Sequence, residues 1–270
     1  MDPPTDEAFG KNDLEKMHRE FWEAHEGDTK DPDNRSSIEG YFQKSDFKDL
    51  TFPAGGKRVR LLVACEKDEG GESGYATEDE KKIDIVQKWA EWNIKLPKGA
   101  DLEVEGIGTE SGVDNELYDE NATLGAYNRT LYALRHSNNN WSRCKKLPDT
   151  QVVGTLLVVC VEKYIRLSVS AEDDPVGYEL VTIYNARTKE MASAVSRGVR
   201  IPEDYVNEAL NLDYSAKKQG NYTDEGVLTA NVEGLAPEEL GVSLTGISWD
   251  ILLWDALDKL RVPYASLKDN

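Results

Sequence analysis

The segment from Val152 to Val161 constrains the fold more than any other part of the sequence. It reads VVGTLLVVCV and is almost continuously apolar. A strand that is covered on both faces of a sheet has this composition, whereas a half-exposed strand alternates between apolar and polar residues. We therefore expect a central strand, and a sheet covered on both faces is typical of an α/β fold.

Strands and a helix alternate before this segment. Arg58–Cys65 is predicted to be a first strand, and a short strand is predicted around Leu102, Val104 and Ile107. A helix between them is indicated by residues at helical spacing: Ile83, Val86, Trp89, Ala90 and Asn93. A strand–loop–helix unit places its loop at the carboxyl edge of the sheet, beside a helix N-terminus that favours anions.

The loop of this unit is long, glycine-rich and acidic. It reads EKDEGGESGYATEDEKK, with seven carboxylates beside Lys67, Lys81 and Lys82. It lacks the GxxxxGK[ST] pattern of a Walker loop. We favour a solvated loop over a triphosphate site, because so many carboxylates repel phosphate unless metal ions intervene.

A longer helix is predicted after Asp119. Its large apolar residues share one face: Leu124, Tyr127, Leu131 and Leu134. Its small residues share a second face that suits close packing: Ala122, Ala126, Thr130 and Ala133. Residues 136–150 are predicted to be a loop.

The second half of the chain predicts further strands and a last helix. Lys163–Ser170 and Tyr178–Tyr184 partly alternate and indicate neighbouring antiparallel strands. Another strand is indicated by Ala192, Ala194 and Val199, a helix by Pro202–Leu210, and a strand or loop by Leu228–Asn231. Ser248 is expected to cap a helix over Trp249–Arg261, which Pro263 ends. Its buried residues are expected to be Leu252, Leu253, Ala256, Leu257 and Leu260.

Residues 1–50 are predicted to be an acidic extension with one amphipathic helix over residues 12–26, and residues 57–265 to be the domain proper. The apolar face of that helix carries Leu14, Met17, Phe21 and Trp22. It either packs on the outside of the domain or docks a partner. His18 and His25 share a face, but without a third ligand we interpret them as surface residues.

The charge and the cysteines limit the classes of function. With 32 basic and 51 acidic residues, the formal charge is −19, which disfavours nucleic-acid binding. No apolar run approaches the ~18 residues of a membrane span, and the N-terminus has no signal-peptide pattern. Cys65 and Cys160 lie in apolar runs, and a third cysteine is Cys144; this sparse set predicts buried thiols and a cytoplasmic location.

The stretch Glu110–Arg129 combines an acidic glycine turn with a helix start and a late arginine. The turn reads ESGV, and the helix opens DENATLGAYNR. Carboxylates, a glycine turn, a helix start and a late arginine fall together in this order nowhere else in the chain, which suggests a site. Alternatively, Asp119 and Glu120 only complement a helix dipole, and Arg129 pairs with a surface carboxylate.

These motifs resemble those of a known family. ESGV, a short spacer and DExAT–GAxNR resemble the house-cleaning inosine/xanthosine triphosphatase family. VVCVEKYIRL, GVRIPEDYVNEAL and SLTGISWDILLWDAL resemble its eukaryotic branch, the C-terminal domain of the proline-rich coiled-coil protein 1 family. The resemblance covers roughly residues 57–265. It implies a two-lobed α/β fold, with a mixed sheet, flanking helices and a nucleotide cleft.

The resemblance also implies roles for individual residues. Glu110 and Glu120 would be the catalytic and metal-binding carboxylates. Nucleotide contacts would come from Lys82, Ser111, Gly112, Thr123, Asn128 and Arg129. The family's enzymes hydrolyse purine nucleoside triphosphates with a divalent cation, so magnesium would be needed if this chain is catalytic. A homodimer is expected, as in the relatives.

The sequence departs from the enzymes at the phosphate-holding elements. The long acidic loop replaces the family's short Thr-Asn-Pro-x-Lys loop, with Lys82 as the best substitute for its lysine. The glycine strand of the family is replaced by Cys160–Ile165, and Trp249 follows Thr245-Gly246-Ile-Ser without the family's arginine. Each lost charged contact costs on the order of 1.5–3 kcal/mol. We therefore expect a degenerate, non-catalytic binding or scaffold module, with a metal-dependent inosine/xanthosine triphosphate phosphatase or pyrophosphatase as the alternative.

Overall fold

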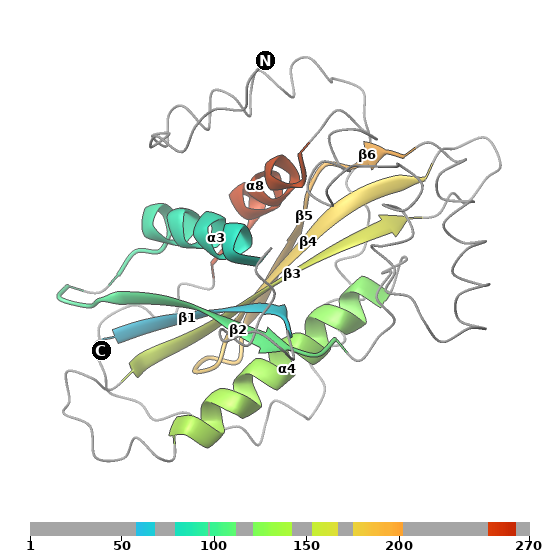
Figure 1. Ribbon diagram of the computed structural model, residues 1–270. Helices are drawn as coiled ribbons and strands as arrows, with labels where there is room; N and C mark the ends of the chain where they lie inside the picture. The colour runs from blue at the N-terminus through green and yellow to red at the C-terminus, as the bar shows by residue number, and fades with distance from the viewer. Residues whose placement is uncertain are drawn as a thin grey trace.

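The computed structural model describes residues 58–67, 79–96, 98–111, 121–141, 153–166, 175–201 and 248–262. These residues form one six-stranded sheet that is flanked by three helices (Figure 1). The sheet has both parallel and antiparallel neighbours, which confirms the predicted α/β class and its mixed sheet. Among the described helices, none is long and apolar enough to cross a membrane.

The parallel half of the sheet is built around β1 (Arg58–Glu66). This strand pairs in parallel with β2 (Leu102–Thr109) on one side and with β3 (Val153–Arg166) on the other. The order through the sheet is β2-β1-β3-β4-β5, so among the described strands β2 forms an edge. The carboxyl ends of the parallel strands therefore meet along one end of the sheet.

The antiparallel half follows from β3. Its neighbour β4 (Val176–Asn185) pairs with it over its whole length, and β5 (Met191–Val195) continues the sheet. A short strand, β6 (Val199–Arg200), pairs with the start of β4. The predicted antiparallel strand over Tyr178–Tyr184 is thus confirmed, and Val199 belongs to a separate strand from Ala192 and Ala194.

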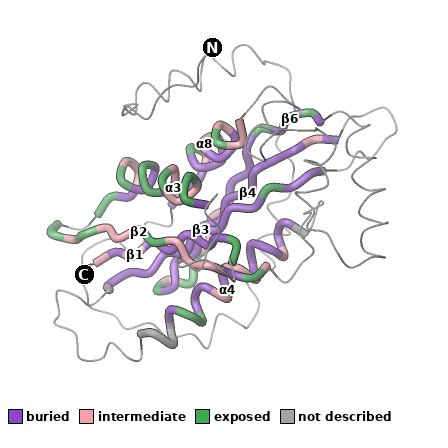
Figure 2. The backbone as a smooth tube through the Cα atoms, viewed as in Figure 1, coloured by how far each residue is buried: buried purple, intermediate pink, exposed green. Residues whose placement is uncertain are grey.

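Helices cover both faces of the sheet (Figures 1 and 2). One face carries α3 (Asp79–Asn93) and α8 (Trp249–Lys259), and the other carries α4 (Asn121–Trp141). The even-numbered residues Leu156, Val158 and Cys160 pack with the α4 cluster, and the odd-numbered Leu157 and Val159 pack with the α3 and α8 cluster. This alternation explains why the central strand has no polar face.

The predicted central strand is confirmed, but it is longer than expected. Residues 154–162 are all buried, and β3 continues to Arg166. The expectation of a separate strand over Lys163–Ser170 is wrong for residues 163–166. Polar and apolar residues mix in this part of the strand because Lys163 is exposed, whereas Tyr164 and Ile165 lie in the core.

The helix boundaries also differ from the prediction. Residues 136–141 belong to α4 and not to a loop, because Ser137 extends the buried stripe of Ala133 and Leu134 by one turn. Asp79, Glu80, Lys81 and Lys82 form the first turn of α3, so the acidic loop ends earlier than expected. Ser248 caps α8 as predicted, accepting a hydrogen bond from the Asp250 amide at 3.3 Å, but this helix ends at Lys259.

Several predictions concern residues outside the described part. They are the 12–26 helix with its two histidines, the Pro202–Leu210 helix, the Leu228–Asn231 segment, Cys144, Gly112, Asp119, Glu120 and Pro263.

Candidate functional site

The candidate site lies where the parallel strands end. Glu66 of β1 stands beside Thr109 of β2, and Ala64 stands beside Cys160 of β3. Residues just beyond these positions therefore meet at one edge of the sheet. We call the following residues the carboxyl-edge cluster: Asp79, Lys82, Thr109, Glu110, Arg129 and Glu162.

Arg129 is the central side chain of this cluster. From α4, its Nε donates to Glu162 Oε1 at 2.9 Å. Its terminal Nη1 donates to the carbonyl oxygens of Thr109 at 2.8 Å and Cys65 at 3.2 Å. Arg129 therefore ties α4 to the ends of β1 and β2 and to the interior of β3. The interpretation that Arg129 pairs with a surface carboxylate is wrong, because its partner Glu162 is only 6% exposed.

The position of Glu162 explains this pairing. Its even register places its carboxylate on the α4 face of β3, between Cys160 and Tyr164 of the core. Burial raises the pKa of the Glu162 carboxyl, and the nearby charges of Arg129 and Lys82 oppose that rise. Burial alone would lower the pKa of Arg129, but Glu162 holds it above its ordinary value. The arginine is thus held protonated by its interior partner.

A second ion pair lies in the first turn of α3. Lys82 binds Asp79 one turn earlier, and Asp79 is 6% exposed while Lys82 is 22% exposed. Asp79 Oδ2 also accepts the backbone amide of Glu66 at 2.7 Å, which joins the end of β1 to the start of α3. Burial acts to lower the pKa of Lys82, but Asp79, followed by Cys65 and Glu162, raises it above its ordinary value. This lysine is a charged, paired residue.

Two cysteine thiols lie beside these pairs. Burial, together with the charge of Asp79, raises the pKa of Cys65 to about 12. Burial, together with Glu162, also raises the pKa of Cys160 well above its ordinary range. Both thiols are free and buried, as predicted, and neither is a reactive thiolate near neutral pH.

The remaining predicted residues occupy the rim of the cluster. Glu110 is 61% exposed and binds Lys67 Nζ at 2.8 Å. Asn128 donates its side-chain amide to the carbonyl oxygen of Ser111 at 2.6 Å, which fixes the turn after β2 against α4. Thr123 is buried in the first turns of α4. The structure thus brings Lys82, Glu110, Ser111, Asn128 and Arg129 to one edge of the sheet.

Sequence reasoning missed the roles of three residues. Glu162 and Asp79 supply the partners of both half-buried cations, and the Thr109 hydroxyl donates to the Cys65 carbonyl at 2.7 Å. Glu162 gave a usable signal, because a carboxylate in an otherwise apolar strand must find a cation. Nothing in the sequence indicated that the cation would be Arg129.

The described residues do not by themselves provide a magnesium site. Among residues 58–67, 79–96, 98–111, 121–141, 153–166, 175–201 and 248–262, no three histidine, cysteine or carboxylate side chains come close enough to share a metal ion. The buried carboxylates of this cluster, Asp79 and Glu162, bind cations of the protein, and Glu110 stands exposed on the predicted turn.

Comparison with solved structures finds distant likenesses. No family model and no curated protein matches the chain. A solved structure, protein VC0702 from Vibrio cholerae, is similar with a TM-score of 0.43 and 14% identity. The similarity covers 74% of this chain and 90% of that one.

Proposed function

We propose that this chain is a non-catalytic binding or scaffold module with an inosine-triphosphatase-like fold. One observation carries the proposal: each cation of the carboxyl-edge cluster already binds a carboxylate of the protein. Arg129 holds Glu162, and Lys82 holds Asp79. Lys67, at the rim, holds Glu110. The side chains that would bind phosphate in an enzyme are used to hold the sheet together.

The energetic argument concerns the buried pair. A phosphate that drew Arg129 away would leave Glu162 as a buried, unpaired charge. Breaking a buried ion pair in this way costs about 3–5 kcal/mol. That cost corresponds to a loss of roughly 10²–10⁴-fold in affinity. A protein partner that binds the outside of the domain avoids this cost, and we propose such a partner, with a homodimer as the working assembly.

A metal-dependent inosine/xanthosine triphosphate hydrolase is the second candidate. It is favoured by the exposed carboxylate of Glu110, which shares its rim with Lys67 and the Ser111 turn. Because Glu110 lies outside the core, its carboxylate could bind a ligand without disrupting the fold. Under this alternative Glu120 would act with Glu110, and purine nucleoside triphosphate would be the ligand.

A hydrolysis assay separates the two candidates. The purified chain is incubated with inosine and xanthosine triphosphates and magnesium, and phosphate and pyrophosphate are followed. The module proposal expects no turnover in the native chain or in Glu110→Gln. Glu103→Gln is the matched control, because Glu103 lies half-exposed on β2, the strand that leads to Glu110, away from the cluster.

Turnover that is lost in Glu110→Gln and kept in Glu103→Gln would overturn the module proposal. Absence of turnover, together with no nucleotide-induced rise in Tm, would overturn the hydrolase. A rise in Tm without turnover would identify the nucleotide as a ligand of the module.

A further inference from the structure

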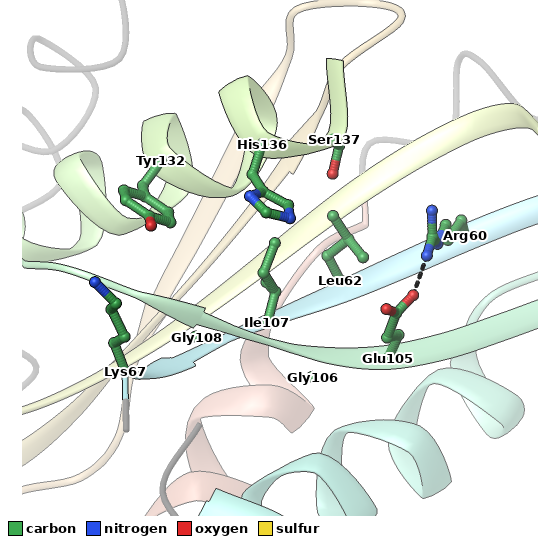
Figure 3. Close-up of a pocket in the computed structure, with 10 residues that line it drawn as sticks. All are labelled: Arg60, Leu62, Lys67, Glu105, Gly106, Ile107, Gly108, Tyr132, His136 and Ser137. Carbon is green, nitrogen blue, oxygen red and sulfur yellow. Dashed lines mark hydrogen bonds and ion pairs between the residues drawn. The ribbon is translucent and has the colours of Figure 1, made fainter. Parts of the chain in front are cut away.

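A groove runs between α4 and the edge strand β2, away from the buried ion pairs. Its volume is about 300 Å³, at the lower end of the range typical of small-molecule sites. Figure 3 shows side chains from β1 and β2 on one side and from α4 on the other. It is lined by Arg60, Leu62, Lys67, Glu105, Gly106, Ile107, Gly108, Tyr132, His136 and Ser137.

The groove exists because α4 lies over the middle of the sheet. This helix packs chiefly against β3, and it covers β1 and β2 less. Residues of β2 before Thr109 are accordingly half-buried, except Glu105, which is exposed. The face of the sheet next to its edge is therefore left open beside the helix.

The middle of the groove is apolar. Leu62 of β1 is 2% exposed, and Ile107 of β2 packs against the same core cluster. In Figure 3, His136 lies over Ile107, and the Ser137 hydroxyl points from α4 toward Leu62. A flat or apolar group placed here would be covered by Leu62 and Ile107 on the sheet side and by His136 on the helix side.

Cations lie at the two ends of the groove. Arg60 binds Glu105 through one terminal nitrogen, but its Nε is buried and has no hydrogen-bond acceptor. Lys67 lies at the other end and binds Glu110. Two cations, Arg60 and Lys67, and one carboxylate, Glu105, line the groove, on a chain whose net charge is −19.

We propose that this groove binds a small organic oxyanion. Its acidic head accepts from Arg60 Nε and the Ser137 hydroxyl, and its apolar or aromatic body packs on Leu62 and Ile107. A guanidinium has five N–H donors, so Arg60 can bind this head while it keeps Glu105. The site is independent of the module proposed above, since it does not draw on Arg129, Lys82 or their carboxylates.

The test measures binding of simple probes to the full chain by isothermal titration calorimetry. Phenyl phosphate and benzoate represent the two head groups, phosphate and carboxylate. Benzyl alcohol lacks the charge, and inorganic phosphate lacks the body. We expect at least one of the two organic anions to bind ten or more times tighter than both of these controls. The proposal would be overturned if inorganic phosphate bound as tightly as the organic anions. It would also be overturned if neither organic anion bound at about 10 mM, a concentration that detects dissociation constants in the millimolar range.

Variants locate the site. Arg60→Met removes the guanidinium and keeps the stem, and it should weaken binding at least tenfold. Arg58→Met is the matched control, because Arg58 lies on the same face of β1, pairs with Glu103 at 3.1 Å and does not line the groove. Ser137→Leu fills the groove and should also weaken binding. Equal losses in Arg58→Met and Arg60→Met would contradict the proposal.

Nuclear magnetic resonance of the native chain locates the bound anion even if a variant fails to fold. The bound anion should shift the backbone amide signals of Gly106 and Gly108 in the native chain. The amide of Gly177, which lies against Trp249 under α8, should not move. Shifts confined to the surroundings of Gly177 would place the ligand elsewhere and overturn the assignment.

Discussion

Arg129 concentrates several structural roles in one side chain. It neutralises Glu162 and also donates to the backbone carbonyl oxygens of Cys65 and Thr109 near the ends of β1 and β2. A buried carboxylate is tolerated only with such a partner. The pair therefore helps to hold the strands in place at this edge, whether or not a ligand binds there.

Replacing Arg129 tests this role. Arg129→Met should lower the free energy of unfolding by about 3–5 kcal/mol, because Glu162 is left buried without its cation. Urea denaturation followed by circular dichroism measures the change. Arg135→Met, an exposed arginine on the same helix, should change it by less than about 0.5 kcal/mol. Similar losses in both variants would show that the pair has no special role.

Glu179 makes the free energy of unfolding depend on pH. Its side chain is 1% exposed, and its Oε2 has no hydrogen-bond partner. Burial raises the pKa of Glu179 to about 7, although Lys163, its partner across the strands, opposes the rise. The folded state holds this proton more tightly than the unfolded state. The contribution to stability is therefore complete below about pH 4.5 and is lost as the pH rises through 7.

Glu179→Gln should remove that dependence. At pH 8 the variant should be more stable than the native chain by on the order of 1–3 kcal/mol, because no buried charge is formed. At pH 5 the two should differ little. Urea denaturation at several pH values measures this, with Glu190→Gln in the exposed turn after β4 as the control. A native chain that gains stability between pH 5 and 8 relative to the variant would contradict the argument.

At the scale of elements, Gly198 governs how β5 leads into β6. A Cβ at this position would overlap Val176 and come within 2.5 Å of the Tyr178 ring. Tyr178 cannot easily yield, because it stacks on Tyr164 with ring centroids 5.3 Å apart. Because residue 198 has no side chain, the connection from β5 to β6 can lie close to β4.

Gly198→Ala should therefore destabilise the protein by about 1–3 kcal/mol, the cost of overpacking. Thermal or urea denaturation measures the loss. Ser193→Ala, a half-buried position on β5, should cost less than about 0.5 kcal/mol. An unchanged Tm in Gly198→Ala would mean that the two tyrosines move aside without cost.

The elements themselves could largely be predicted, but their contacts could not. Apolar runs and helical spacing indicated β1, β3, α3 and α8 because burial imposes a period on each of them. The end of α4 was misplaced because Ser137 is polar yet buried, so tertiary packing outweighs its weak helix preference. The Arg129–Glu162 pair depends on the register of β3 against β1, which local sequence does not encode.

At the scale of the whole molecule, the sheet should be most protected at its centre. The amides of β3 bond to neighbours on both sides, whereas among the described strands β2 and β5 have a neighbour on one side. Hydrogen exchange should therefore be slowest in β1 and β3. Exchange of peptides covering Leu102–Thr109 at the same rate as Val153–Arg166 would indicate a further partner on the β2 edge.

The placement of β1 has a consequence for synthesis on the ribosome. Its first pairing with β3 joins Arg58 to Val153, so roughly 95 residues must be made after Arg58 before that side of β1 can be covered. At about 5–20 residues per second, this takes on the order of 5–20 s. During that interval the nascent chain presents an apolar strand with an unpaired side. Chaperones that recognise such strands have their best opportunity then, before the rest of the domain has emerged.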